Sequence, residues 1–330
     1  MLERVVIATS PWAAAGLMVA AVAAVAFGAH WMVDSASRLA KRVGVSELIV
    51  GLTIVAMGTS SPELAVSLIA AFGGKSDVSV GNIIGSNIFN LGFILGGCAL
   101  FGAIPTPMGM LRRDGLVLLL GGFLLLGLVG ADLGLGQLDG GVFLGSLACY
   151  VALLFWQRRA DLTTTSPEND PPEPDTAPLW RHVAWDLGLV LGGLFLILAG
   201  SRVMVLTATE VATTLGISEW VIGVTVVAAG TSVPELATSL VAAMKRNYGI
   251  SAGSLIGSDI FNIFGVLGVA GLVSPMSIDP AARGSLVAMT LMTALVLVFM
   301  RTGWRLTRTE GGVLVVCAVA RWAYDLSLAP

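Results

Sequence analysis

Charged side chains are scarce in this sequence. Asp, Glu, Lys and Arg together make up 12% of the 330 residues, about half of their share in an ordinary soluble domain. The 18 basic and 21 acidic residues give a net charge of -3, which leaves no basic surface for nucleic-acid phosphates. A nucleic-acid partner is therefore excluded.

Cysteine and histidine are also rare, with three and two residues. Cys98, Cys149 and Cys317 lie far apart within apolar runs, so the chain has neither disulfide nor metal-ligand spacing. We expect these cysteines to be packed or lipid-facing small apolar side chains. Their spacing excludes the class of proteins held together by disulfides.

Hydrophobic residues dominate what is present, at 56% of the chain with a mean hydropathy of +0.89. Apolar stretches of roughly 20 residues recur from end to end, which is the length of a membrane-spanning helix. The sequence predicts an all-α polytopic membrane protein in contact with the lipid bilayer, and no obligatory protein partner is evident. Ten transmembrane helices are expected, at residues 11–33, 46–72, 78–101, 115–131, 137–156, 183–207, 218–244, 250–273, 284–300 and 310–328.

Basic residues are unevenly distributed between alternate loops of these spans. One side carries 13 of them and the other carries 4, with Arg202 inside a span. Because basic loops stay in the cytosol, we expect both termini outside and the central loop, residues 158–182, in the cytosol. This loop is rich in proline and acidic residues, which predicts a solvated linker. The membrane is predicted to be the cytoplasmic (inner) membrane of a prokaryote.

A shift of 172 residues lays the second half of the chain on the first. Residues 44–72 and 216–244 are identical at 18 of 29 positions, and residues 79–90 match 251–262 at the same shift. Because five spans lie in each half, the second copy enters the membrane from the opposite side. The chain is thus predicted to consist of two inverted five-helix repeats, which suit alternating access; a duplicated scaffold without a transport role is the alternative. The repeats are residues 1–157 and 183–330.

A polar segment with a proline interrupts the second and the seventh span. The two segments are GTSSPE, residues 58–63, and GTSVPE, residues 230–235. Proline lacks an N–H and clashes with the preceding turn, so each helix should break there. We expect the breaks to free main-chain oxygens around Ala56 and Ala228 to point into the protein.

The polar residues inside the spans are oxygen donors. Glu63 and Glu235 are costly at the centre of a bilayer, and without nearby basic residues they imply a cation from outside the chain. Calcium takes about six to eight oxygen ligands and sodium has similar chemistry, whereas the lack of His, Cys and Met disfavours transition metals. The candidate ligands are Thr59, Ser60, Glu63, Ser86, Asn90, Thr231, Ser232, Glu235, Ser258 and Asn262, with the main-chain oxygens of Ala56 and Ala228. No cofactor is expected.

The segments GTSSPEL…GNIIGSNIFN and GTSVPEL…GSLIGSDIFN resemble the α-1 and α-2 repeats of the cation/calcium antiporter superfamily, in particular those of prokaryotic sodium/calcium exchangers. The corresponding ranges are 51–95 and 223–267, and the resemblance covers essentially the whole chain. It implies a transporter, not an enzyme, that exchanges sodium for calcium, with three sodium ions per calcium ion. It also implies that Glu63 and Glu235 are the bridging carboxylates of the ion site.

Two positions need separate interpretation. The second motif ends in Asn in both halves, at Asn90 and Asn262, where some members of the superfamily have Asp in one half. We therefore expect the central charge to be that of the two glutamates alone. Asp259 stands where the first repeat has Asn87, and about 100° of helix rotation separates it from Ser258. This favours helix packing or a place on the access path for Asp259 over direct ligation.

Other residues near the motifs have structural interpretations. Glu47 and Glu219 follow serines at predicted helix starts, where an acid complements the helix dipole. Glycines four residues apart in the third and eighth spans are predicted to let these helices approach their neighbours closely. These glycines are Gly81, Gly85, Gly253 and Gly257.

Two other functions remain open from the residues. A proton/calcium exchanger would use the same deep carboxylates as proton carriers, although the Thr and Ser oxygens supply more ion ligands than a proton needs. An intramembrane serine protease would use Ser251, because residues 249–253 fit the pattern G-x-S-x-G. That serine lacks a histidine base on a later helix, and the metalloprotease motif H-E-x-x-H is absent.

Overall fold

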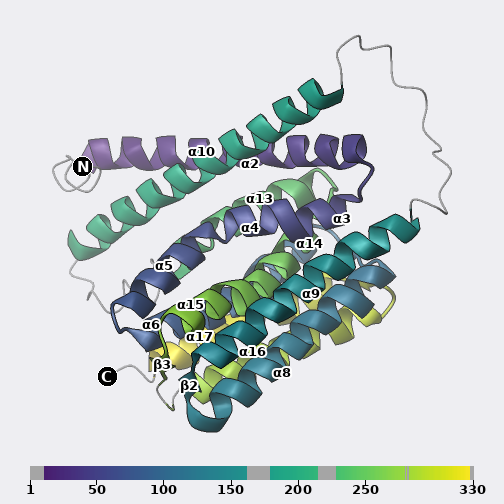
Figure 1. The fold of residues 1–330 in the computed structure, drawn as a ribbon. Coiled ribbons are helices and arrows are strands. Elements are labelled where there is room, and N and C mark those ends of the chain that lie inside the picture. Colours follow the sequence, from purple (N-terminus) through teal and green to yellow (C-terminus); the bar gives the residue numbers. More distant parts are fainter. Residues whose placement is uncertain (1–10, 162–178, 215–227, 279, 281, 328–330) are drawn as a thin grey trace.

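The computed structural model describes residues 11–161, 179–214, 228–278, 280 and 282–327, and these are mostly helical (Figure 1). The π-helical segments carry the label η. The helical elements of the first half are α2 (Pro11–Val43), α3 (Glu47–Val50), η1 (Gly51–Val55), α4 (Ala56–Thr59), α5 (Ser61–Phe72), α6 (Ser76–Ile88), η2 (Phe89–Leu95), α7 (Gly96–Phe101), η3 (Met110–Gly115), α8 (Leu116–Asp132) and α9 (Gln137–Asp161). Those of the second half are α10 (Leu179–Thr214), α12 (Ala228–Thr231), α13 (Val233–Met244), α14 (Tyr248–Ile260), η5 (Phe261–Val266), α15 (Leu267–Val273), α16 (Ala282–Arg301) and α17 (Arg308–Ser327).

Within the described residues, six helices are long and apolar enough to cross a membrane. A seventh is counted if Glu47–Thr59 and Ser61–Phe72, which meet at an angle of 46°, form one span. The predicted class, a helical membrane protein with many spans, is confirmed. Residues 215–227, where the predicted seventh span begins, lie outside the described residues, as do Glu219 and most of the predicted linker.

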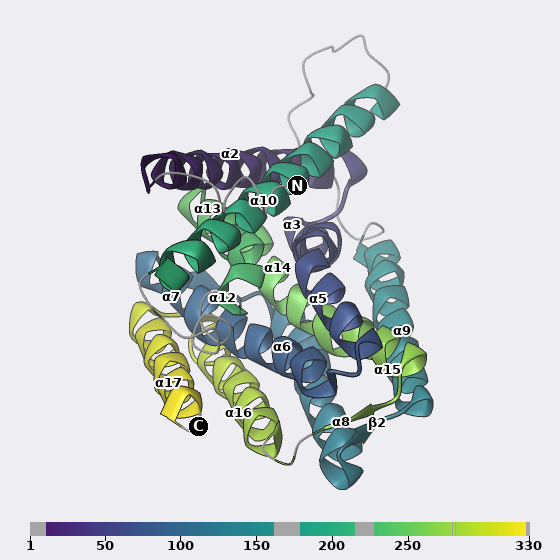
Figure 2. The same cartoon turned by 90° about the vertical axis from the view of Figure 1, so that its left-hand side faces the viewer.

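Two long helices, α2 and α10, cross each other along one side of the molecule, and the other helices form a bundle beside them (Figures 1 and 2). A Cβ atom added to Gly28 would lie 2.6 Å from the main-chain oxygen of Gly193, so the crossing is close only because both residues are glycine. Near one end, Asp186 accepts hydrogen bonds of 2.8 Å from both Arg38 and Arg42.

The helix α2 is ten residues longer than the predicted span 11–33, since it continues to Val43. Its last turns carry Arg38, Lys41 and Arg42, which hydropathy places outside a membrane. The ion pairs with Asp186 hold this polar extension against α10. Hydropathy measures the apolar length of a helix and does not detect such tertiary support.

The centre of the bundle is formed by the two continuous runs α6–η2–α7 and α14–η5–α15. Every residue of α14 from Ile250 to Ile260 is buried, and a Cβ added to Gly257 would lie 2.6 Å from the main-chain oxygen of Leu52. Gly253 makes a similar close approach to Leu48, which confirms the packing role predicted for this glycine pair. The residues equivalent to Leu48 and Leu52 in the second repeat lie outside the described residues, so the role of Gly81 and Gly85 stays a prediction.

In the described part of the chain, four short strands, which the all-α prediction did not include, join connections of the first half to connections of the second. The strand β1 (Ile104–Pro105) pairs with β4 (Arg305–Leu306), and β2 (Gly134–Leu135) pairs with β3 (Met276–Ser277), both antiparallel. Each strand has two residues, so the pairs serve to satisfy main-chain groups of the connections rather than to build a sheet.

Two smaller predictions are also confirmed. Ser46 is the N-cap of α3, where its side chain accepts a hydrogen bond from the amide of Ile49, and Glu47 occupies the first turn. All three cysteines are free, and Cys98 is buried in the apolar core. Neither feature carries the chemistry of the central polar residues.

Candidate functional site

The two proline segments break their helices as predicted. In the first half α4 ends at Thr59 and α5 begins at Ser61, with Ser60 outside helical geometry at φ −79° and ψ 8°. In the second half α12 and α13 are separated by Ser232, at φ −90° and ψ 9°. A proline stands at the second position of each following helix, where its missing N–H costs least.

The main-chain oxygens around the first break differ from the prediction. The oxygen that Pro62 leaves without a helical donor is that of Gly58, and the Ser61 hydroxyl donates to it at 2.7 Å. The oxygen of Ala56 is not freed, because the amide of Ser60 donates to it at 3.0 Å. It still belongs to the polar cluster, since the hydroxyl of Ser258 reaches it at 3.3 Å. Ala228 begins α12, and its contacts are not described.

The two glutamates are bonded across the repeats. The hydroxyl of Ser60 donates to Glu235 at 3.0 Å, and the hydroxyl of Ser232 donates to Glu63 at 3.1 Å. These two hydrogen bonds are equivalent under the shift of 172 residues. All four side chains are fully buried. Each break therefore supplies a carboxylate and also the hydroxyl that binds the carboxylate of the other half.

Ser258 and Thr59 extend this cluster around Glu235. The hydroxyl of Ser258 lies 3.3 Å from Oε1 of Glu235 and 3.4 Å from the hydroxyl of Thr59. Thr231, the equivalent of Thr59, interacts with Glu63. Ser86 is buried on α6, but it forms no hydrogen bond with a described residue. Among the predicted hydroxyl ligands, Ser86 is thus the one that the described hydrogen bonds do not join to the cluster.

Asn90 and Asn262 join a second buried set of polar groups. Asn90 donates to Oδ1 of Asp259 at 2.9 Å, and Asn262 donates to Oδ1 of Asn87 at 3.0 Å. Asn87 in turn donates to the main-chain oxygen of Asp259 at 3.2 Å. Asp259 therefore links α14 to η2 and α6, in agreement with the predicted packing role. We call Asn87, Asn90, Asp259 and Asn262 the polar quartet.

Both asparagines lie in π-helical segments that sequence periodicity did not predict. Asn90 is the second residue of η2 and Asn262 the second residue of η5. A π-helical turn widens the backbone and leaves main-chain groups without their usual partners, and such turns are frequent at functional sites. The repeated SxIFN sequence is the only signal for these positions, because it places the same residues at both turns.

Five oxygens of this region are buried and accept no hydrogen bond from the described residues. They are Glu63 Oε2, Glu235 Oε2, Asn90 Oδ1, Asn262 Oδ1 and Asp259 Oδ2. Within the described part of the chain, no Lys, Arg or His forms an ion pair with these carboxylates. Burying a carboxylate without a counter-charge is costly. The region therefore has the chemistry of a site that receives cations.

The donors suit a hard cation. In the described ranges no three His, Cys, Asp or Glu residues gather into a metal-binding group, so hydroxyl, amide and main-chain oxygens must complete the coordination. Calcium and sodium accept such neutral oxygens, whereas zinc and copper select nitrogen and sulfur.

Two further clusters of polar side chains, which were not predicted from the sequence, lie near the glutamate segments. Ser67 donates to the main-chain oxygen of Ser79 at 3.2 Å, and Asn82 donates to Ser67 at 3.1 Å. The second half repeats this arrangement, with Ser239 in contact with Ser251 and Ser254. All of these residues are polar in apolar spans and recur at the shift of 172 residues, which is the signal that could have identified them.

The same cluster removes the protease alternative. The hydroxyl of Ser251 donates to the main-chain oxygen of Ser239 at 2.9 Å, and the side chain is fully buried. It is thus a packing serine between α13 and α14, without the base and the access to substrate that a nucleophile needs.

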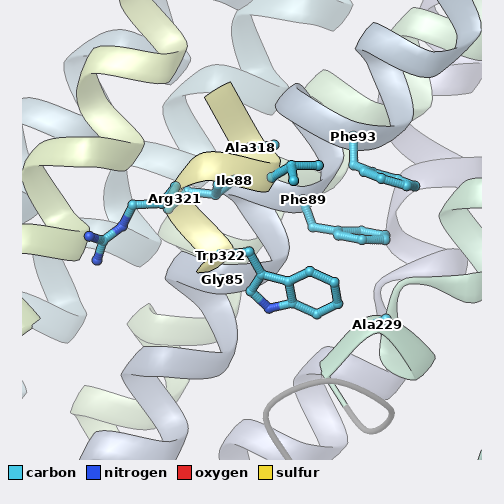
Figure 3. A pocket seen from close by; sticks show the side chains of 9 residues that line it. Gly85, Ile88, Phe89, Phe93, Ala229, Ala318, Arg321 and Trp322 are labelled. Carbon is cyan, nitrogen blue, oxygen red and sulfur yellow. The ribbon is translucent and has the colours of Figure 1, made fainter. Parts of the chain in front are cut away.

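A separate pocket lies beside α6 (Figure 3). Phe89 and Phe93, with ring centroids 5.0 Å apart, line it together with Trp322 and Ala229. Its lining is apolar apart from Arg321 and includes none of the predicted ligands. It therefore does not coincide with the candidate ion site.

Comparison with known proteins identifies the family of the chain. Residues 13–156 and 185–320 match the family described as "Sodium/calcium exchanger protein". The chain belongs to this family. Both matched segments contain one proline break and one half of the polar quartet, so the family match covers every described residue of the site.

The similarity to individual proteins and to a solved structure covers nearly the whole chain. The putative antiporter CaxA of Alkalimonas amylolytica is 38% identical over 303 residues, which are 89% of this chain and 92% of CaxA. The inner membrane protein YrbG of Escherichia coli is 34% identical over 314 residues, 94% of this chain and 95% of YrbG. A structure of the sodium-calcium exchanger NCX_Mj superposes with a TM-score of 0.80 at 30% identity and covers 94% of this chain and 98% of that one.

Proposed function

We propose that this chain is a secondary antiporter that exchanges sodium for calcium across the membrane. The observation that carries the proposal is the crossed pairing of Ser60 with Glu235 and of Ser232 with Glu63, whose free carboxylate oxygens are buried without a counter-charge. The two carboxylates together balance one calcium ion, and the hydroxyl oxygens beside them provide subsites for the smaller charge of sodium.

The ligand set of this proposal is the one named from the sequence, with a different reason for Ala56. Thr59, Ser60, Thr231 and Ser232 lie next to the glutamates, and Ser258 bridges to the main-chain oxygen of Ala56. Ser86 and Ala228 stay in the set by their equivalence to Ser258 and Ala56 under the repeat. No step of the exchange requires a cofactor.

Alternating access is the mechanism that we infer, with ten spans arranged as two inverted five-helix repeats. Support comes from the shift of 172 residues and from the equivalent hydrogen bonds that join the halves. Two copies related by an axis in the membrane plane have two near-equivalent arrangements, one open to each side. A site shared between the copies is then reached from one side at a time.

The deciding experiment is calcium-45 flux into proteoliposomes with sodium, potassium and proton gradients imposed separately. We expect uptake to follow the sodium gradient. Uptake that follows a pH gradient without sodium would instead establish the proton/calcium exchanger, for which the buried carboxylates would be proton carriers. Uptake under none of the gradients would refute both proposals.

The coupling ratio is proposed to be three sodium ions per calcium ion, so that one net positive charge crosses in each cycle. A potential of 100 mV then changes the driving force by about 2.3 kcal/mol, roughly fifty-fold in the equilibrium calcium ratio. Uptake should therefore shift strongly when valinomycin and potassium set the potential. Indifference to potential would exclude this ratio.

We further propose that both termini face outward and that the central loop faces the cytosol of a prokaryotic cell. The uneven distribution of basic residues supports this orientation. The similarity to the inner membrane protein YrbG supports a location in the cytoplasmic membrane. A cysteine at Thr164 in a background without the native cysteines should react with an impermeant maleimide only in opened cells. Labelling of intact cells would reverse the orientation.

A further inference from the structure

The polar quartet contains one charge that its packing does not require. A shift of 172 residues carries Asn87 to Asp259 and Asn90 to Asn262, so the two side-chain bonds of the quartet are equivalents. In one, Asn262 donates to an amide oxygen at 3.0 Å; in the other, Asn90 donates to a carboxylate oxygen at 2.9 Å. The amide at Asn87 shows that a neutral side chain is sufficient to accept this bond.

Asp259 is nevertheless fully buried. Its side chain accepts a hydrogen bond from a neutral amide only, and within the described residues it forms no ion pair. Its second oxygen, Oδ2, has no hydrogen-bond partner there, nor do Oδ1 of Asn90 and Oδ1 of Asn262. The charged form of such a carboxylate requires a counter-charge, and three oxygens of the quartet, one of them on Asp259, have no hydrogen-bond partner among the described residues.

We propose that Asp259 holds a monovalent cation, sodium in the sodium-loaded protein, and so determines how many sodium ions the site takes. This inference rests on the proposed sodium/calcium exchange. With Glu63 and Glu235, Asp259 brings the number of buried carboxylates to three, which three sodium ions balance. One calcium ion balances the two glutamates alone. Asp259 thus favours the sodium-loaded form over the calcium-loaded form.

The test is ion binding to the purified full chain, measured by isothermal titration calorimetry with sodium and with calcium. In Asp259→Asn the carboxylate is replaced by the amide that occupies the equivalent position, so the quartet keeps its shape. We expect the sodium concentration for half-saturation to rise about tenfold and the sodium Hill coefficient to fall. Calcium affinity should change less than twofold.

A second variant moves the charge instead of removing it. Asn87→Asp combined with Asp259→Asn exchanges the two equivalent side chains and keeps three carboxylates. This double variant should restore most of the sodium affinity lost in Asp259→Asn. It also keeps the proposal testable if the single variant unfolds, which thermal unfolding in detergent would show.

Two results would overturn the proposal. Unchanged sodium binding in Asp259→Asn would leave helix packing as the only role of Asp259. A loss of calcium affinity larger than the loss of sodium affinity would make Asp259 a calcium ligand. Wild-type flux distinguishes a failure of the exchange function from a failure of the role given to Asp259. If the wild type shows no sodium-dependent calcium flux, the exchange function fails; if it does and Asp259→Asn binds like the wild type, only this inference fails.

Discussion

The two halves of the molecule share the crossed serine–glutamate bonds and the side-chain bonds of the polar quartet, and they differ in the charge of that quartet. Ser60 and Ser232 donate to the glutamate of the other half at 3.0 and 3.1 Å, and the two bonds of the polar quartet are just as similar. At positions 87 and 259, however, one half has an amide and the other a carboxylate. The comparison teaches that the repeat sets the geometry of the site, while a single substitution can change its charge without changing that geometry.

The largest effect is expected from the glutamates, where the halves should be equal. Glu63→Gln and Glu235→Gln each keep the shape of the side chain and remove a charge that a divalent ion needs. Sodium-driven calcium-45 uptake should fall to background in both variants. The matched control is Glu310→Gln. Glu310 lies at the start of α17 and accepts hydrogen bonds from the hydroxyls of Thr302 and Thr307, so this variant should transport normally. Wild-type flux in both site variants, with insertion into the membrane verified, would remove the glutamates from the site.

The next largest effect is expected from alanine at the glycines where helices pack closely. It compares Gly257 of the second half with its equivalent in the first half, whose packing partner lies outside the described residues. In Gly257→Ala the new methyl group would lie 2.6 Å from the main-chain oxygen of Leu52, so the backbones must separate. We expect a loss of about 1–3 kcal/mol in the free energy of unfolding, measured by thermal unfolding in detergent.

A Cβ on Gly85 meets nothing within 4 Å among the described residues. The equivalent variant Gly85→Ala should nevertheless destabilise as much if the residues equivalent to Leu48 and Leu52, which lie outside the described residues, pack against it. Gly145→Ala is the control, because a Cβ on this exposed residue of α9 meets nothing within 4 Å. Equal stability of Gly85→Ala and Gly145→Ala would show that the close approach exists in one half only.

A smaller effect is expected at the crossed serines. Ser60→Ala and Ser232→Ala each remove a hydroxyl that binds a buried carboxylate, a contact worth about 1.5 kcal/mol or somewhat more. Calcium affinity should fall about tenfold in each variant. Ser61→Ala is the matched control, because the hydroxyl of Ser61 bonds to the main-chain oxygen of Gly58 and not to a glutamate. An effect in only one of the two halves would show that the site is used asymmetrically.

The smallest effect is expected at the supporting serines. Ser67→Ala and Ser239→Ala remove hydrogen bonds between neutral groups, which contribute about 1 kcal/mol each to stability. Both variants should lower the midpoint of thermal unfolding slightly and leave the sodium dependence of uptake unchanged. A changed sodium dependence would place these serines among the ion ligands.

Much of the site could be predicted because its signals are local or repeated. Pro62 and Pro234 break their helices through the chemistry of proline alone, so the two breaks followed from the sequence. The candidate ligands were recognisable because polar residues are rare in these spans and recur at one fixed shift. The glycine contacts of α14 were predictable for the same reason.

The rest depends on contacts between distant segments. That Ser60 binds the glutamate of the other half, and not its own, is decided by how α4, α5, α13 and α14 pack. The π-helical turns at Asn90 and Asn262 leave hydropathy unchanged. The main-chain oxygen of Ala56 was predicted to be freed by the proline, but the oxygen that Pro62 leaves without a helical donor is that of Gly58, four residues before it. The hydroxyl of Ser61 donates to that oxygen. The extension of α2 to Val43 likewise depends on Asp186.

The crossed serine–glutamate bonds also constrain the order in which the protein is made. Glu63 enters the membrane with the first helices to leave the ribosome, whereas its donor Ser232 is synthesised 169 residues later. Until then the carboxylate lacks the hydroxyl that binds it in the finished protein. The first half alone therefore contains a carboxylate whose hydrogen-bond donor has not yet been synthesised.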